Sequence, residues 1–485
     1  YLYNHVHFLK PVYHIFLYKP EVLFYIIHLK SVINLYIYCK KQLMNHNTKT
    51  IIGSGLCGPL LAIYLSQRNY QVRLYEKRQD IRALDVSAGK SINLALSHRG
   101  IQALKSAKIF DKIEPYLTPM KGRMIHNKNG EIEFQPYSMH NHEYINSVSR
   151  AELNKVLMNQ AESSELVEIF FDHSLLEIDD NAKELVFNNG VRVPINSHIF
   201  GADGSGSIIR NYIDKKSALP STIEPLGHSY KELHISPNQS NEYQLEPNAL
   251  HIWPRGEFML IALPNMDKSF TCTLFLPTTG EISFSSLTTN KLISTFFEEY
   301  FEDVLPILEN FPDIYFSNPT GRLSTVYAEE WQYNNQYCLM GDAAHAIVPF
   351  FGQGMNASFE DCQILMDCLD ISNGDWEDLF IRYNMLRKED TDAIAKMAIE
   401  NYLEMRDLVA KKEYIKERKI SNILYKHYPN YFIPRYNMVS FTSIPYSEVY
   451  KRGKIQKKII SKLNIKNLDL SKAKKMVHEQ LNSIL

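Results

Sequence analysis

A glycine-rich turn between two apolar runs has the residue types and spacing of a nucleotide-binding turn. It reads Gly-Ser-Gly-Leu-Cys-Gly over 53–58, directly after the apolar run 49–52 and before a helical apolar pattern. Gly53 permits a tight turn, Gly55 lets the backbone approach a pyrophosphate, and Gly58 lets a helix pack on a strand. Glu76 ends the next apolar run, where an acid binds a ribose hydroxyl. This arrangement predicts a Rossmann-type site for FAD or NAD rather than NADP.

A second stretch, 341–361, combines an acid with another glycine-rich loop. The apolar run 336–340 ends in Gly341-Asp342, and the loop Gly352-Gln353-Gly354 leads into a helical pattern from Met355 and Asn356. The two loop glycines let the backbone come close to a flat ligand. The free N–H groups and positive dipole end of the helix would face that ligand. This combination suits reduced flavin bound as FAD, and the alternative is an ordinary strand–loop–helix connection.

Two further positions are candidates for cofactor contact. Asp203 lies in Gly201-Ala202-Asp203-Gly204, a close-approach turn that does not form a second dinucleotide motif. Arg150 begins a helix that Ser149 and Glu152 cap as a capping box. Arg150 faces either a cofactor phosphate or ribityl chain, or solvent, and the residues favour neither.

Segment 123–137 has the pattern of a β-hairpin with Asn129-Gly130 as its turn. A two-residue loop would place Arg123 opposite Pro136, and a three-residue loop would place it opposite Tyr137. Either register brings Arg123 close to Tyr137. A guanidinium beside a phenol binds carboxylates well because it offers a planar fork of donors. The alternative is a surface arginine lying over an aromatic ring.

Composition limits the class of protein. The chain has 485 residues, of which 45% are hydrophobic and 22% charged, enough for two or three domains with a sizeable core. The net charge of −1 gives no basic excess that would indicate nucleic-acid binding. The six cysteines form no CxxC pair and lie in apolar surroundings, which favours reduced thiols in a cytoplasm. No metal site is predicted.

The first 43 residues are atypical, and the sequence does not begin with Met. Three interpretations remain open for residues 1–43: translated sequence outside the natural protein, a membrane anchor, or an additional helix. The run Val22–Ile37 contains Lys30 and is a marginal membrane span. We favour the first interpretation because a clean domain start follows Met44. The core is therefore expected to begin at 44, with membrane association through 1–43 as the alternative.

The remaining patterns predict an α/β fold with three parts. An FAD-binding domain comprises 44–105 with 145–212 and 321–374, and a substrate-side domain comprises 106–144 with 213–320. In the latter, Asn248–Pro277 reads as three antiparallel strands. The C-terminal region 375–485 is helical by spacing, with helices expected over 375–409 and 411–428. Its basic end, 451–485, reads as a solvated helical face, with membrane-surface attachment as a minor alternative.

In this order, the motifs resemble those of FAD-dependent aromatic hydroxylases. Five segments are similar to the kynurenine 3-monooxygenase family, and the likeness extends over roughly Lys49 to Ser447: 89–100, 123–126, 250–255, 269–275 and 341–361. The resemblance implies tightly bound FAD, NADPH as a transient reductant and dioxygen as co-substrate. It also implies conversion of L-kynurenine to 3-hydroxy-L-kynurenine through a flavin hydroperoxide, in tryptophan degradation and NAD biosynthesis via quinolinate. The alternatives are a related hydroxylase of another aromatic acid, or a non-catalytic FAD-binding protein.

The resemblance further implies roles for individual residues. The amino-acid end of the substrate would be bound by Arg123, Tyr137, Asn401 and Tyr436. FAD would be contacted by Cys57, Tyr75, Glu76, Lys77, Arg78, Ala95, Arg150, Leu175, Asp342, Met355 and Asn356, together with the motif residues Gly53, Gly55, Gly58, Asp203 and Gly354. No residue is expected to be a strong acid or base, because the ring amine of kynurenine activates the neighbouring carbon. Mitochondrial members end in a membrane-anchoring tail, and 451–485 has no comparable apolar run, so a cytoplasmic enzyme of the bacterial type is expected.

Overall fold

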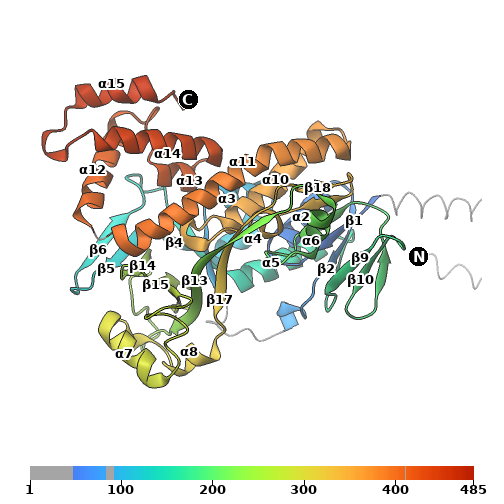
Figure 1. Ribbon diagram of the computed structural model, residues 1–485, viewed down its shortest axis with the longest axis horizontal. Coiled ribbons are helices and arrows are strands. Elements are labelled where there is room, and N and C mark those ends of the chain that lie inside the picture. Colours follow the sequence, from blue (N-terminus) through green and yellow to red (C-terminus); the bar gives the residue numbers. More distant parts are fainter. Residues whose placement is uncertain (1–46, 84–91, 410, 485) are drawn as a thin grey trace, which may run out of the picture.

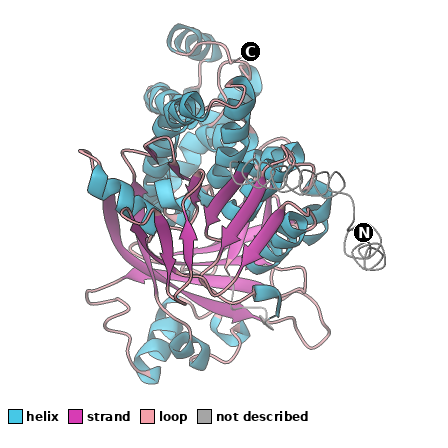
Figure 2. Cartoon of the chain, turned by 90° about the vertical axis from the view of Figure 1, so that its right-hand side faces the viewer, coloured by secondary structure: helices cyan, strands magenta, loops and turns pink. Residues whose placement is uncertain are grey.

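The computed structural model describes residues 47–83, 92–409 and 411–484 (Figure 1). The predicted N-terminal extension 1–43 therefore lies outside the described residues, as do 89–91 of the first segment that carries the resemblance. Strands occupy the centre of the molecule, and the C-terminal helices gather at one end of it (Figure 2). The predicted α/β class with a helical C-terminal region is confirmed.

A six-stranded sheet forms the core of the nucleotide-binding part. Its strand order is β18-β19-β12-β1-β2-β8, and every pair is parallel except β18–β19. Helices pack against its strands, and β12 and β19 are buried along their whole length. The strands are β1 (Thr48–Ile52), β2 (Gln71–Tyr75), β8 (Val167–Phe170), β12 (Ile199–Gly201), β18 (Gln332–Tyr333) and β19 (Tyr337–Leu339). The main helices are α2 (Cys57–Ser66), α5 (Arg150–Glu162), α6 (Ile208–Lys216) and α10 (Gly354–Ile371).

A seven-stranded sheet, in the order β17-β13-β16-β15-β14-β5-β6, forms the substrate side. All its pairs are antiparallel except β14–β5. The three strands predicted over 248–277 are confirmed as β14 (Ala249–Pro254), β15 (Met259–Pro264) and β16 (Phe270–Pro277). The others are β5 (Gly122–His126), β6 (Ile132–Pro136), β13 (Thr222–Ile235) and β17 (Gly321–Tyr327). Because β17 pairs with β13, we propose that the domain boundary lies after 327 rather than at 321.

Both predicted registers of the β5–β6 hairpin are wrong, that of the two-residue loop by one residue and that of the three-residue loop by two. Arg123 lies opposite Gln135, and Gly122 lies opposite Pro136. The Asn127 N–H donates to the Glu131 carbonyl at 2.9 Å, so the loop consists of three residues, 128–130. Gly130 closes it with φ 84°, the left-handed conformation that such loops require at their last position.

Smaller elements connect the two sheets. Two three-stranded sheets contain β3 (Asn93–Leu96), β4 (Thr118–Met120) and β7 (Ile145–Ser149), and β9 (Leu175–Asp179), β10 (Glu184–Phe187) and β11 (Arg192–Pro194). The short helices are η4 (Ile81–Ala83), α3 (His98–Ser106), α4 (Phe110–Ile113), η5 (Glu114–Tyr116), α7 (Asn290–Tyr300), η6 (Leu305–Ile307), α8 (Asp313–Ser317), α9 (Asp342–His345) and η7 (Pro349–Phe351). The predicted cap of α5 is confirmed, since the Ser149 hydroxyl accepts from the Glu152 N–H.

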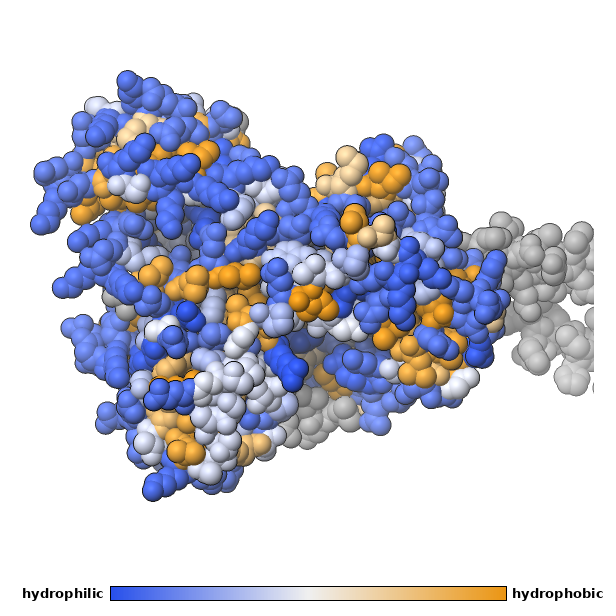
Figure 3. Space-filling view, viewed as in Figure 1, coloured by the Kyte–Doolittle hydropathy of each residue, from blue (hydrophilic) through white to orange (hydrophobic). Residues whose placement is uncertain are grey.

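The C-terminal region begins with the longest helix described, α11 (Trp376–Leu403), which crosses the molecule in orange in Figure 1. A π-helical turn, η8 (Glu404–Leu408), continues it. The remaining helices are α12 (Lys412–His427), α13 (Arg435–Phe441), α14 (Tyr446–Ser461), η9 (Ile465–Asn467) and α15 (Leu470–Gln480). Hydrophilic side chains cover much of this end of the molecule in Figure 3. Within the described ranges, every helix is too short or too polar to cross a membrane.

Candidate active site

The glycine turn that joins β1 to α2 has two glycines held by the fold and one that faces open space. A Cβ atom on Gly53, whose φ is +104°, would lie 2.4 Å from the Ala202 carbonyl oxygen. A Cβ on Gly58 would lie 2.0 Å from the Gly53 oxygen. A Cβ on Gly55 would meet no atom within 4 Å. The backbone at Gly55 is therefore open to a ligand, as close approach of a pyrophosphate requires.

Glu76 lies directly beside this turn. Its carboxylate is 5% exposed and accepts hydrogen bonds from the Ser54 N–H at 2.8 Å and from the Arg78 Nε at 2.8 Å. Burial acts to raise the pKa of Glu76, but Arg78 and the Ser54 N–H outweigh it and hold the pKa below its usual value. Lys77 and Arg78 are exposed next to it. An ionised acid at the end of β2 can accept from a ribose hydroxyl.

The second glycine-rich loop forms the other wall of the site. Gly341, at φ +55°, turns the chain so that Asp342 is exposed at the beginning of α9. Asn356, in the first turn of α10, donates to the carbonyls of Ala95 at 2.8 Å and Gly352 at 2.7 Å. Its own carbonyl accepts from the Ser97 N–H at 2.9 Å. The buried amide therefore fixes the loop against β3 and α3, and leaves the backbone N–H groups of Gly354 and Met355 at the N-terminus of α10.

Several residues expected to contact FAD direct their side chains elsewhere. The Cys57 Sγ faces α10 and lies 3.6 Å from the Cys362 Sγ. The Tyr75 ring stacks on Phe170, with 4.9 Å between centroids, inside the core. For Cys57 and Tyr75, only the backbone remains for a cofactor contact.

The Asp203 carboxylate caps α6 rather than extending toward a ligand. It accepts from the Ser207 hydroxyl at 2.5 Å and from the Ile208 N–H at 2.7 Å. Leu175 is buried where β9 begins, whereas Arg150 is exposed at the first position of α5. Arg150 is thus available to an anionic group.

Arg123 and two tyrosines form a buried cluster on the seven-stranded sheet. Arg123 is 4% exposed, and its guanidinium carbon lies 5.7 Å from the ring centroid of Tyr137 and 5.0 Å from that of Tyr436. The two rings are stacked, 5.0 Å apart and 10° from parallel. Among the described residues, the buried Arg123 Nε and Tyr137 hydroxyl have no hydrogen-bond partner. Buried donors are normally satisfied, so this cluster has capacity for a polar ligand.

Glu404 completes this cluster and is absent from the residues that sequence reasoning selected. Its Oε1 lies 3.6 Å from the Arg123 Nη1 and accepts from the Tyr414 hydroxyl at 2.6 Å. It follows Asn401 by three residues, the spacing of neighbours on one helix face. That spacing is the signal that would have found it. Burial raises the pKa of Tyr137 well above its usual value, so its phenol remains a donor.

Asn401 connects this cluster to the second glycine-rich loop. Its amide nitrogen donates to the Phe350 carbonyl at 2.6 Å and to the Met405 sulfur at 3.3 Å. The neighbouring Phe351 ring stacks on Tyr436 with 5.5 Å between centroids. Phe350 in turn contacts Phe275 on β16 at 4.9 Å. Together with partly buried Leu250 and Ile261, these rings give the cluster an apolar wall suited to an aromatic ring.

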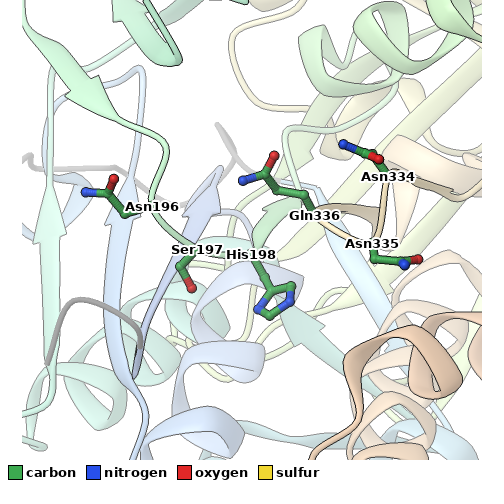
Figure 4. A pocket seen from close by; sticks show the side chains of 6 residues that line it. All are labelled: Asn196, Ser197, His198, Asn334, Asn335 and Gln336. Carbon is green, nitrogen blue, oxygen red and sulfur yellow. The ribbon is translucent and has the colours of Figure 1, made fainter. Parts of the chain in front are cut away.

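A separate polar cavity of about 390 Å³ lies at the end of the parallel sheet where β12 and β19 begin (Figure 4). It is lined by Asn196, Ser197, His198, Asn334, Asn335 and Gln336, which precede the strands β12 and β19. Ligands of open α/β sheets bind beyond the carboxyl ends of the strands. This cavity is therefore distinct from the nucleotide site.

Comparison with known proteins agrees with this geometry. The model of the FAD binding domain family matches residues 47–372. The kynurenine 3-monooxygenase of Myxococcus xanthus is 41% identical over 448 residues, which cover 90% of this chain and 96% of the relative. That of Dictyostelium discoideum is 39% identical over 456 residues, covering 89% and 98%.

Solved structures confirm the fold. The 2-methyl-3-hydroxypyridine-5-carboxylic acid oxygenase aligns with a TM-score of 0.62 at 19% identity, over 76% of this chain and 95% of that one. The residues matched by the FAD binding domain family include the glycine turn, Glu76, exposed Asp342 and the N-terminus of α10. The chain belongs to the FAD-binding hydroxylases and, within them, to the kynurenine 3-monooxygenase family.

Proposed function

We propose that this protein is an FAD-dependent, NADPH-consuming monooxygenase that converts L-kynurenine to 3-hydroxy-L-kynurenine. The observation that carries the proposal is the pair of buried Arg123 and partly buried Glu404, 3.6 Å apart, beside an apolar wall. An amino acid presents a carboxylate and an ammonium group close together, and this pair matches both. The carboxylate binds Arg123, the ammonium group binds Glu404, and the aryl ring lies along the apolar wall.

The side chains of the site hold the substrate rather than move its protons. Bound FAD, once reduced by NADPH, supplies the chemistry that activates dioxygen. The aniline amine of kynurenine already donates electrons to the ring carbon beside it, so the site needs no strong base. Tyr137 and Tyr436 are buried and their pKa values are raised, which keeps both phenols as donors to the carboxylate. Catalysis then depends on orientation and on exclusion of water.

We assign FAD contacts to the backbone at Gly53, Gly55, Cys57 and Gly58 and to the carboxylates of Glu76 and Asp342. The helix N-terminus at Gly354 and Met355 faces the flavin and stabilises negative charge on it. Asn356 positions that N-terminus through its bonds to Ala95 and Gly352. Asn401 positions Phe350 and thereby the ring pocket.

The test uses the purified full chain with FAD, NADPH, air and L-kynurenine. NADPH oxidation that depends on kynurenine, with a product heavier by one oxygen atom at C3, is the expected result. An FAD-loaded protein that ignores kynurenine and responds to another aromatic acid would overturn the substrate. An FAD-loaded protein that leaves NADPH unoxidised with every aromatic acid tested would favour a non-catalytic FAD-binding protein.

We further propose that the enzyme works in the cytoplasm, in tryptophan degradation and NAD biosynthesis. The five described cysteines are buried free thiols. The Cys57 and Cys362 sulfurs lie 3.6 Å apart without a bond, which suits a reducing compartment.

A further inference from the structure

A buried carboxylate holds the turn from which Asp342 extends. Asp361 on α10 is fully buried and accepts from the Gly341 N–H at 3.1 Å and from the Arg387 Nε at 2.7 Å. The His345 Nε2 lies 2.5 Å from the same carboxylate. Burial acts to raise the pKa of Asp361, but His345 and Arg387 hold it below its usual value. One charge therefore fixes both ends of the short helix α9, next to the proposed flavin contact.

The same cluster extends to the Gly352-Gln353-Gly354 loop. We call this loop and the turn at Gly341 the flavin loops. Arg387 donates through Nη1 to Glu360 at 2.7 Å, and Arg99 donates to the other Glu360 oxygen at 2.6 Å. The Arg99 guanidinium lies 3.8 Å over the ring of Tyr446. The Tyr446 hydroxyl donates at 2.8 Å to Gln353, the middle residue of the Gly-Gln-Gly loop. An unbroken series of side-chain contacts thus joins Gly341 to Gln353.

These side chains come from four helices, two of which belong to the C-terminal region. Arg387 lies on α11, and Tyr446 lies on α14 beside it (Figure 1). Helix α11 also carries Asn401, 14 residues or about 21 Å further along. Helix α11 therefore lies beside the flavin loops before it ends at the substrate cluster.

The energetics argue for a role beyond stability. Arg387, Asp361 and Arg99 are all buried, and desolvating such charges costs several kcal/mol each. Well-packed apolar residues of similar volume often stabilise a core as much or more. What charged groups offer in addition is directional bonding, which sets the position of two loop backbones.

We propose that Arg387 and Tyr446 are positioning residues through which the C-terminal helices fix both flavin loops relative to the substrate cluster. We call the contacts of Asp361, Arg387, Glu360, Arg99, Tyr446 and Gln353 the flavin brace. Its part in turnover rests on the proposed function, whereas its part in FAD binding does not. Without the brace, the loops fold but hold the flavin loosely, and activated oxygen escapes as hydrogen peroxide instead of reaching the substrate.

The first test compares Arg387→Lys with Arg452→Lys. Arg452 is also a buried arginine, 5% exposed against 0% for Arg387, and from α14 it bonds the carbonyls of Tyr431 and Asn482, away from the flavin loops. The readouts are the FAD Kd of the apoprotein by fluorescence, the apoprotein Tm, and hydrogen peroxide formed per NADPH with kynurenine present. Arg387→Lys is expected to raise the Kd at least tenfold and the peroxide yield at least threefold. Arg452→Lys is expected to change neither by more than twofold.

The second test uses Tyr446→Phe, which removes only the hydroxyl bond to Gln353 and keeps the ring under Arg99. It is expected to leave the apoprotein Tm within 2–3 °C, on the scale of about 1 kcal/mol, and to raise the peroxide yield at least twofold. If Arg387→Lys and Tyr446→Phe both keep the wild-type Kd and peroxide yield, the flavin brace is merely structural and the inference is overturned. If the wild type ignores kynurenine while Arg387→Lys still weakens FAD binding, the proposed substrate fails and the flavin brace stands.

Discussion

Arg123 and Glu404 are opposite charges held beside stacked phenols. Their separation of 3.6 Å is long for an ion pair, and the Arg123 Nε has no partner. A free amino acid can satisfy both groups at once, because its own charges are as close together. Arg123 should therefore contribute to substrate affinity and not to cofactor affinity.

We expect Arg123→Ala to raise the KM for L-kynurenine at least about 25-fold, while the FAD Kd stays within twofold. Truncating one partner of a buried charge pair costs about 2–5 kcal/mol, and each 1.4 kcal/mol is tenfold. Steady-state kinetics and a fluorescence titration of FAD measure the two effects separately. A variant with unchanged KM would remove Arg123 from the substrate site.

Glu404→Gln tests the other charge. The variant should lower kcat/KM for L-kynurenine about tenfold or more, since hydrogen bonds to charged groups contribute about 1.5–3 kcal/mol. Kynurenine without its α-amino group is the matched control, because it has no ammonium group for Glu404 to bind. Its kcat/KM should fall by less than threefold. Equal losses for both compounds would mean that Glu404 acts only by orienting Arg123.

At the scale of elements, one glycine of the β1–α2 turn is needed for folding and another for contact with the ligand. Gly58→Ala places a Cβ 2.0 Å from a backbone oxygen, whereas Gly55→Ala places it in open space. Gly58→Ala should destabilise the apoprotein by several kcal/mol because neither backbone can move freely. Gly55→Ala should leave the apoprotein Tm unchanged and weaken FAD binding at least tenfold. The assignment of Gly55 to the pyrophosphate is wrong if its alanine variant binds FAD as the wild type does.

The elements were the part that sequence reasoning predicted best. Apolar runs and turn residues locate β1, β2, β14, β15 and β16 because burial on a sheet requires those residues at those positions. Neither predicted hairpin register was right, since Asn127 and Glu131 close the three-residue loop 128–130, which places Arg123 opposite Gln135 rather than Tyr137. The direction in which a side chain points could not be predicted from the sequence either. Tyr75 lies at the predicted place, and its ring enters the core because Phe170 is adjacent in space but distant in sequence.

At the scale of the whole molecule, the substrate cluster draws on segments more than 300 residues apart, from β5 to α13. Arg123, Glu404 and Tyr436 meet only because α11 crosses the molecule and returns the chain to the seven-stranded sheet (Figure 1). No local pattern encodes such a meeting. The family resemblance supplied Asn401 and Tyr436, but the bond from Asn401 to Phe350 and the presence of Glu404 required the fold.

The stability of the whole fold should also depend on pH near neutrality, chiefly through one partly buried acid. Glu232 on β13 is half-buried, and burial raises its pKa to about 7 against the opposing effect of Arg150. Its usual pKa is 4.5, so between pH 4.5 and 7 the folded chain binds more protons at this site than the unfolded chain. Stability from this group is thus fully present below pH 4.5 and is lost as the pH rises through 7.

Glu232→Gln removes that titration and keeps the neutral shape of the side chain. Apoprotein unfolded by urea at several pH values should show equal stability for variant and wild type near pH 4.5. The variant should be the more stable of the two at pH 8, with the difference growing through the window between. Asp179→Asn is a control, because backbone N–H groups and Arg192 lower the pKa of Asp179 at the end of β9, so its titration lies below this window. Parallel pH profiles for wild type and Glu232→Gln would show that Glu232 is ionised in the folded protein.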